Sequence, residues 1–320
     1  MPITLAQAKV GMADHVDQQV VDAFRRSSLL LDRLTFDNAI SPGTGGSTLT
    51  YGYMQLKTPG TAAVRQINNE YTPQEAIREE KTAKAAIMGG AFQIDRVIQS
   101  TSGAIDEMAF QAEEKIKATA NEFHNLAING AKATSFDGLK ALLAGSSTEV
   151  TSTIDLSTSA TMDTNANAFL DALDEFMSLL DGTPDMLIMN RKLLAKLRGI
   201  ARRAGYYAQT RDEFGRVVET YNGIELMDAG NYYDGTQSKT VDVIPEDSTA
   251  KTTDLYAVKF GLDGFHGISP TGTAVIQSYM PDMTEPGAVK KGEVELVAGV
   301  VLKNTLKAGV MHGIQTSPKA

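Results

Sequence analysis

Apolar residues recur at helical spacing in two long segments of the chain. From Asp14 to Leu34 they follow three-, four- and seven-residue steps, which predicts an amphipathic helix with Asp14 as its N-cap. From Gly103 to Asn129 an apolar stripe runs through an Ala-, Glu- and Lys-rich segment without proline, and Gly130 is a typical residue just past a helix end. A helix of about 26 residues is close to 40 Å long. We therefore expect this second helix to be a spine, longer than a small globule needs.

Two strand-like runs lie between these helices. Thr48–Lys57 is rich in Thr and Tyr, and Ala85–Ile94 carries Gly89-Gly90 at its centre. The polar stretch between them, Thr58–Lys84, has balanced charges and no apolar core of its own. A long excursion of this kind is uncommon in a compact domain. Two interpretations stay open: a solvated, frayed hairpin tip, and a segment that lies across another subunit.

The second half of the chain mixes helix and strand patterns. Ser and Thr supply 11 of the 20 residues from Ser146 to Asn165, which predicts a domain boundary. A buried strand is predicted at Met186–Met189, with amphipathic helices on either side, at 169–180 and 191–203. Asn222-Gly223 between two strand-like runs is typical of a β-hairpin. Further strands are expected at 241–244, 255–260, 274–279, 293–302 and 306–314, and the predicted fold class is α+β.

Composition narrows the class of protein. The chain has 320 residues, 42% hydrophobic and 22% charged, which is typical of a folded protein with a sizeable core. It has no cysteine, which excludes disulfides and thiolate-bound metals. No window approaches the roughly 18 apolar residues of a membrane span, and the first residues do not form a secretory signal. The net charge of −9 opposes non-specific binding of DNA over the whole surface, but not the enclosure of DNA that carries its own counterions.

Motifs for catalysis and ligand binding are missing from the sequence. The four histidines, His15, His124, His266 and His312, do not have the spacing that places two metal ligands on one helical face. The glycine-rich segment Ser41–Ser47 is not followed by the lysine of a phosphate-binding loop, so we interpret it as a linker. We assign no catalytic, cofactor-binding or metal-binding residue and expect no cofactor. An enzyme with scattered catalytic residues stays open as a disfavoured alternative.

One segment has an uneven distribution of charge. Basic residues outnumber acidic ones strongly from 191 to 216. One interpretation is a solvated helix face followed by a polar loop. The other is a contact between subunits, in which this basic surface meets acidic residues of a neighbour. The basic residues are Arg191, Lys192, Lys196, Arg198, Arg202, Arg203, Arg211 and Arg216, and the candidate acidic residues are Asp171, Asp174, Glu175 and Asp181.

The order of these parts resembles the major capsid proteins of tailed bacteriophages, the Hong Kong 97 (HK-97) fold family. The likeness covers nearly the whole chain, and its weight rests on order and spacing. Asn125–Gly130 followed by Phe136–Leu139 resembles the end of the spine helix and the next turn. Met186–Leu197 resembles a strand and helix of the central domain, and Asp254–Gly267 and Val294–Gly309 resemble the later strands.

The resemblance implies an HK-97-like capsid fold with five consecutive regions. Residues 1–46 form an N-terminal arm (N-arm), and residues 47–96 form an extended β-hairpin loop (E-loop). Residues 97–145 hold the spine helix and part of the peripheral domain, and residues 146–275 form the axial domain. Residues 276–320 return as strands of the peripheral domain.

The resemblance also implies a function and a set of partners. The chain would be a structural protein, not an enzyme, that assembles with itself into pentamers and hexamers of an icosahedral shell. The shell would enclose double-stranded DNA, contacted non-specifically, and would carry a portal protein. The expected location is the virion capsid, assembled in the cytoplasm of the bacterial host and without a membrane. An encapsulin-like bacterial compartment shell is the alternative, disfavoured by the long N-terminal arm and by the sequence of the loop and spine-helix regions.

Two features of the family are matched only in part. Some relatives carry a long N-terminal scaffolding segment that is cleaved off, whereas only about a dozen residues precede the first predicted helix here. A separate scaffolding protein is therefore expected, unless the sequence is that of an already processed chain. Some relatives also join subunits through an isopeptide bond between a loop lysine and a peripheral-domain asparagine. Lys57, Lys81, Lys84 and Asn304 are residues of the right types, but we expect them to have ordinary roles.

Overall fold

The computed structural model describes residues 29–40, 49–58, 60–97, 107–133, 135–204, 208–211, 217–234, 237–270, 275–282, 284 and 286–319. Within them the helices are α2 (Leu29–Arg33), α4 (Glu107–Asn129), α5 (Leu139–Leu143), α6 (Ser159–Ser178), α7 (Arg191–Ala204) and the 3-10 helix η1 (Thr305–Lys307). The strands are β1 (Phe36–Ile40), β2 (Thr50–Thr58), β3 (Ile77–Lys84), β4 (Ala86–Asp95), β5 (Glu149–Thr151), β6 (Met186–Met189), β7 (Ala208–Arg211), β8 (Val217–Tyr221), β9 (Ile224–Asp228), β10 (Asn231–Asp234), β11 (Lys239–Asp242), β12 (Thr252–Val258), β13 (Phe265–Pro270), β14 (Ile276–Tyr279), β15 (Val289–Leu302) and β16 (Ala308–Gln315). The predicted α+β class is confirmed.

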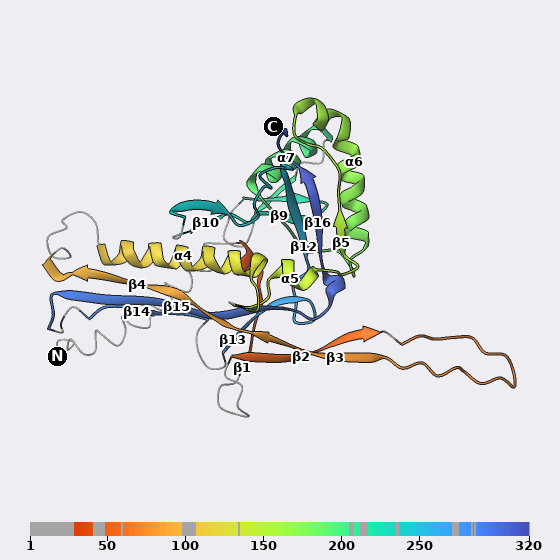
Figure 1. Ribbon diagram of the computed structural model, residues 1–320, viewed down its shortest axis with the longest axis horizontal. Coiled ribbons are helices and arrows are strands. Elements are labelled where there is room, and N and C mark those ends of the chain that lie inside the picture. The colour runs from red at the N-terminus through yellow and green to blue at the C-terminus, as the bar shows by residue number, and fades with distance from the viewer. Residues whose placement is uncertain are drawn as a thin grey trace.

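An elongated layer is formed by α4 and a five-stranded sheet (Figure 1). The sheet has the order β1-β13-β15-β14, and β4 also pairs with β15, from Val289 to Ala298. The apolar stripe of α4 packs on this sheet, with Ile116, Ala120 and Phe123 in the same core as Leu296 and Val300 of β15. The predicted spine helix is thus confirmed from Glu107 to Asn129, and it is held along its length by β4 and β15.

A seven-stranded sheet stands over one end of this layer (Figure 1). Its order is β5-β16-β12-β6-β9-β8-β7. All four residues of β6 are buried, because alternate side chains serve opposite faces of the sheet. Met186 and Ile188 pack in the core shared with α4 and α5, whereas Leu187 and Met189 pack in the core shared with α6 and α7. The short apolar run predicted as a buried strand is confirmed.

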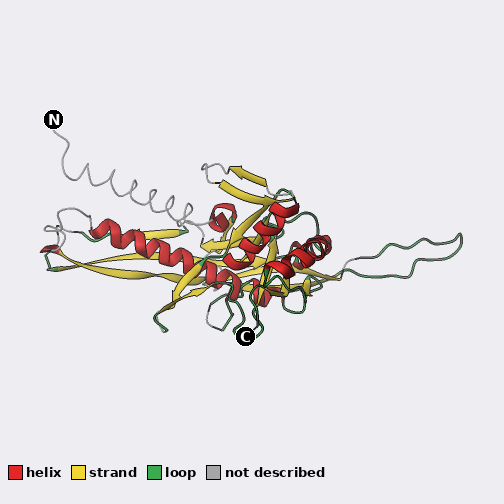
Figure 2. Ribbon diagram, turned by 90° about the horizontal axis from the view of Figure 1, so that it is seen from above, coloured by secondary structure: helices red, strands yellow, loops and turns green. Residues whose placement is uncertain are grey.

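A two-stranded ribbon, β2 and β3, leaves the body and extends well beyond it (Figures 1 and 2). The strands pair antiparallel from Thr50 opposite Lys84 to Thr58 opposite Ile77. All the residues of the connecting segment 60–76 are exposed. The ribbon therefore gains almost no burial at its outer end from the described part of the chain.

Three strands, β3, β13 and β16, pair with partners that the sequence did not lead us to expect. β3 lies inside the stretch that was expected to be a polar excursion, and it pairs with β2, whereas β4 pairs with β15 in the five-stranded sheet. β13 joins the five-stranded sheet although it lies within 146–275. β16 joins the seven-stranded sheet although it lies within 276–320. The physical reason is that strand partners are chosen by non-local packing, which local patterns do not encode.

The N-terminal arm is described only at its end. Most of the helix predicted from Asp14 to Leu34 lies outside the described residues, and α2 forms its last turns. Leu30, Leu31 and Leu34 are buried in the core with α4. Arg33 binds Glu225 of β9 through both its Nε, at 3.2 Å, and its Nη2, at 2.5 Å. The end of the arm therefore joins the seven-stranded sheet to the layer formed by α4.

Candidate assembly surface

The extended ribbon exposes large apolar side chains. The Arg65 guanidinium lies 5.6 Å from the centre of the Tyr71 ring, but that ring is still more than half exposed. Val64, Ile67 and Tyr71 in the connecting segment are exposed by 102%, 90% and 58%, and Met54 and Ile77 on the strands by 64% and 54%. Exposed apolar side chains gathered on one projecting element are typical of an interaction site, so another surface is their expected partner. The charged side chains between them would form the polar part of that contact.

Aromatic and charged groups anchor the base of the ribbon to the body. The ring of Tyr51 stacks on Tyr53 with centroids 6.1 Å apart, and its edge-on contact with His266 has a separation of 6.3 Å. The Nζ of Lys303 lies 5.5 Å from the Tyr51 ring centroid, and the Tyr51 hydroxyl donates to Asp37 at 3.1 Å. Strands β1, β2 and β13 and the residue that follows β15 thus meet at the Tyr51 side chain, which fixes the direction in which the ribbon leaves the body.

Burial shifts the titration of two groups at this anchor. Burial lowers the pKa of His266, against the opposing effect of the hydrogen bond with the Gly264 carbonyl, and the charge of Lys303 lowers it further. Burial also raises the pKa of the Tyr53 hydroxyl, and the charge of Asp137 adds to this. Both groups are therefore neutral at pH 7, so the anchor depends on packing, on the Tyr51–Asp37 hydrogen bond and on the contact of the Lys303 ammonium with the Tyr51 ring.

The basic segment is largely paired within its own subunit. Four cations of α7 bind acidic residues of the same chain, and Lys196 donates to the Ser157 carbonyl at 2.9 Å. This favours the local interpretation for those residues. Arg202 is exposed and has no ion pair among the described residues, and Arg216 lies outside them. The four pairs are Arg191–Asp228 at 3.2 Å, Lys192–Glu246 at 2.7 Å, Arg198–Glu219 at 2.5 Å and Arg203–Asp163 at 2.5 Å.

The four residues considered for isopeptide cross-links lie in different parts of the fold. Lys81 and Lys84 are exposed on β3, and Lys57 lies on β2. The side chain of Asn304 accepts a hydrogen bond from the Leu306 N–H at 3.0 Å and so caps η1. Asn304 therefore has a structural role within the subunit, and the ordinary roles expected for all four stay a prediction.

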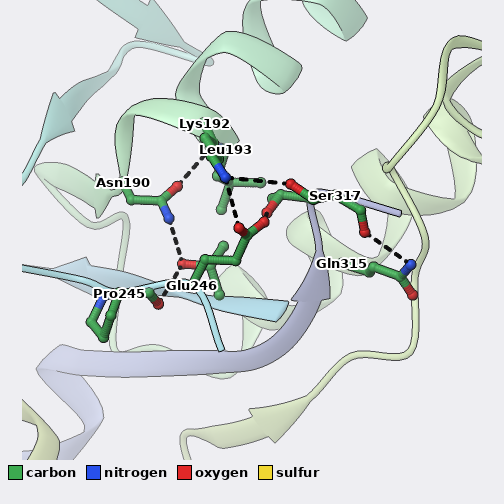
Figure 3. Close-up of polar contacts among 9 residues, drawn as sticks. Asn190, Lys192, Leu193, Pro245, Glu246, Gln315 and Ser317 are labelled. Carbon is green, nitrogen blue, oxygen red and sulfur yellow. Dashed lines mark hydrogen bonds and ion pairs between the residues drawn. The ribbon is translucent and has the colours of Figure 1, made fainter. Parts of the chain in front are cut away.

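A polar network fastens the C-terminal segment to the seven-stranded domain (Figure 3). Asn190 caps α7 by accepting from the Leu193 N–H at 2.8 Å, and it donates to Thr253 at 2.9 Å. Lys192 and Thr316 both donate to the carboxylate of Glu246, at 2.7 and 2.8 Å. These contacts hold residues 315–317 against the start of α7.

The same network shifts the titration of Glu246. Burial alone would raise the pKa of Glu246, but hydrogen bonds from Lys192, Ser317 and Thr316 outweigh burial and lower its pKa to about 2. No local sequence pattern identifies Glu246, because its partners Lys192 and Thr316 lie 54 and 70 residues away along the chain.

The described part of the chain brings one histidine together with two carboxylates. His312 Nε2 lies 3.2 Å from Glu149 Oε1, and His312 Nδ1 lies 2.9 Å from Asp254 Oδ1. Two surface hollows, of about 470 and 310 Å³, each include one titratable side chain, Asp174 and Glu175 respectively. Burial lowers the pKa of His124 to about 4, so this residue of α4 is neutral in the core. The described residues hold no group of three or more side chains that could bind a metal ion, and none of their helices is long and apolar enough to cross a membrane.

Comparison with known proteins identifies the fold. No protein-family model matches the chain, and no curated protein matches it by sequence. Among solved structures, the SrpI encapsulin complex from Synechococcus elongatus PCC 7942 matches with a TM-score of 0.60 at 15% identity, over 91% of this chain and 89% of the other. Mycobacterium phage Ogopogo matches with a TM-score of 0.57 at 12% identity, over 89% and 91% of the two chains. The capsid of Myoviridae phage XM1 matches with a TM-score of 0.52 at 12% identity, over the same shares. The chain therefore has the Hong Kong 97 fold, as the sequence resemblance implied.

Proposed function

We propose that this chain is the major capsid protein of a tailed bacteriophage, which assembles with itself into an icosahedral shell around double-stranded DNA. The observation that carries the proposal is the extended ribbon, residues 50–84, whose outer apolar side chains are more than half exposed in the described chain. Since the described part of the chain leaves them exposed, we assign their burial to another subunit. Many such contacts, each weak, give a stable closed shell through multivalency.

The proposal includes partners and a location. The subunits would form pentamers and hexamers with the help of a separate scaffolding protein, and one vertex would hold a portal protein. The net charge of −9 agrees with a shell wall that contacts packaged DNA non-specifically and weakly. The virion capsid is the proposed location, with assembly in the cytoplasm of the bacterial host.

Deletion of the ribbon tip tests the proposal. The variant replaces residues 59–76 with a two-residue Asn-Gly turn that joins β2 directly to β3; residues 60–76 are all exposed. We expect the deleted chain to fold with an unchanged melting temperature and to sediment as a subunit or small oligomer under conditions in which the full chain forms shells. A matched control replaces Thr61 and Gln74 with alanine and keeps the tip length. Normal shells from the deleted chain would refute the role of the ribbon.

An encapsulin-like compartment shell is the second candidate, because an encapsulin matches this chain in structure over 91% of its length. The contents of the particles distinguish the two. A phage capsid packages nuclease-protected DNA when produced with its terminase and portal, whereas a compartment shell encloses a protein cargo and no protected DNA. Mass spectrometry and nuclease protection of purified particles measure both outcomes.

A further inference from the structure

The seven-stranded sheet ends in two strands that pair on one side only within the described residues, β5 and β7. β5 bonds to β16 through alternate residues: the Val310 N–H donates to the Thr148 carbonyl at 3.1 Å, and the Ser152 N–H donates to the His312 carbonyl at 2.7 Å. Because backbone groups alternate in direction along a strand, the N–H and carbonyl of Thr151 point away from β16. An edge of this kind is a template for a strand from another chain.

A groove runs beside the β5 edge. Residues 150–154 form one wall, α6 forms the other, and Met311 lies between them, in a hollow of about 310 Å³. Leu179, at the end of α6, is 42% exposed and borders this groove. A strand laid along β5 would place its own side chains over these apolar groups, so backbone pairing and apolar burial are available at the same place.

The charges of the two covering helices are opposite and lie toward opposite edges of the sheet. α6 contains four acidic residues and no Lys or Arg, and it lines the β5 groove. α7 contains six basic residues and no acidic one, and it contacts β9 and, through Arg198, Glu219 of β8. Asp171 and Glu175 on α6 and Arg202 on α7 have no ion pairs among the described residues. One subunit therefore carries both halves of a complementary contact.

We propose that the β7 edge of one subunit pairs with the β5 edge of the next, so that acidic α6 of one copy faces basic α7 of its neighbour. This inference rests on the proposed function, and it names the occupant of the groove as a second copy of this chain. The contact joins two different surfaces, the β7 edge and the β5 edge. A growing row of subunits therefore always has a free β5 edge at one end and a free β7 edge at the other. Repetition closes a ring when the rotation per subunit fits, as it would around the centres of pentamers and hexamers.

Chemical cross-linking of introduced cysteine pairs tests the contact directly, because the natural chain has no cysteine that could react in their place. Thr151 or Thr153 is replaced by cysteine together with Ala208, Gln209 or Thr210 of β7, which gives six double variants. A thiol-to-thiol linker that spans about 8 Å reaches both direct and diagonal neighbours across a strand pair, so the panel covers the registers available to β7. The variants are linked after assembly and separated under denaturing conditions, and electron microscopy of each sample records whether shells or rings formed.

The expected result is a ladder of linked chains that ends at five or six, from at least one double variant and from none of the five single-cysteine controls. Assembled particles without linked chains in all six double variants would overturn the inference and leave the proposed function standing. Linked dimers from Thr153→Cys alone would overturn it too, because they would show that two β5 edges meet. Failure of the cysteine-free chain to assemble at all would count against the proposed function itself.

Discussion

Glu246 is a residue whose negative charge stabilises the fold through hydrogen bonds with Lys192 and Thr316. Its folded-state pKa, about 2, is lower than the ordinary value of 4.5. A lowered folded-state pKa contributes stability above the unfolded-state value, and this contribution is lost as the pH falls from about 4.5 toward 2.

We predict that Glu246→Gln lowers the free energy of unfolding at pH 7 by about 1–3 kcal/mol, because the charged hydrogen bonds with Lys192 and Thr316 are weakened. Chemical denaturation of the unassembled subunit at several pH values measures the effect. The difference from the natural chain should shrink between pH 5 and pH 2. Glu175→Gln, on the exposed face of α6, is the matched control and should change stability little. An effect of equal size at pH 7 and pH 2 would contradict this account.

At Gly89 the backbone of the neighbouring strand lies so close that it leaves no room for a side chain. A Cβ atom at Gly89 would lie 2.0 Å from the Val294 carbonyl oxygen of the paired strand β15. We predict that Gly89→Ala destabilises the subunit by about 2–4 kcal/mol through distortion of the β4–β15 pairing. Gly60→Ala is the control, since no atom lies within 4 Å of its added Cβ. Equal melting temperatures for the two variants would show that β15 yields at this position.

At the scale of elements, the base of the ribbon depends on Tyr51. We predict that Tyr51→Ala raises the hydrogen-exchange rates of β2 and β3 about tenfold, which corresponds to about 1.4 kcal/mol, because the contacts with Tyr53, His266 and Lys303 are lost. Tyr51→Phe removes only the hydrogen bond to Asp37 and should give a smaller increase. Exchange in α6 and α7 serves as the internal reference. Unchanged exchange in β2 and β3 would mean that the ribbon is anchored elsewhere.

Elements with a buried stripe or run could be predicted from the sequence. The spine helix, the four-residue strand β6, α7 and the Asn222-Gly223 hairpin each combine a strong apolar pattern with a local start or stop signal, and each is confirmed. β3 could not be predicted, because seven of its eight residues are exposed and apolar alternation is absent. Long-range pairs such as Arg33–Glu225, 192 residues apart, also leave no local pattern.

The candidate assembly surface, too, could be predicted from the sequence only where local patterns reveal it. The charge and length of the loop predicted a segment in need of a partner, and its exposed apolar residues agree with that interpretation. The basic segment predicted a charged surface, but not which cations are paired, because the acidic partners of α7 come from α6, β8, β9 and the segment before β12. Only the folded structure shows that Arg202 of α7 and Asp171 and Glu175 of α6 have no ion pair among the described residues.

For the whole molecule, the central claim is that the chain buries its extended ribbon against other copies of itself in a closed shell. Negative-stain electron microscopy of the full chain, expressed alone and with a candidate scaffolding protein, measures this most directly. The account predicts closed, uniform icosahedral particles under at least one of these conditions. Compact monomers under every condition tested would contradict it.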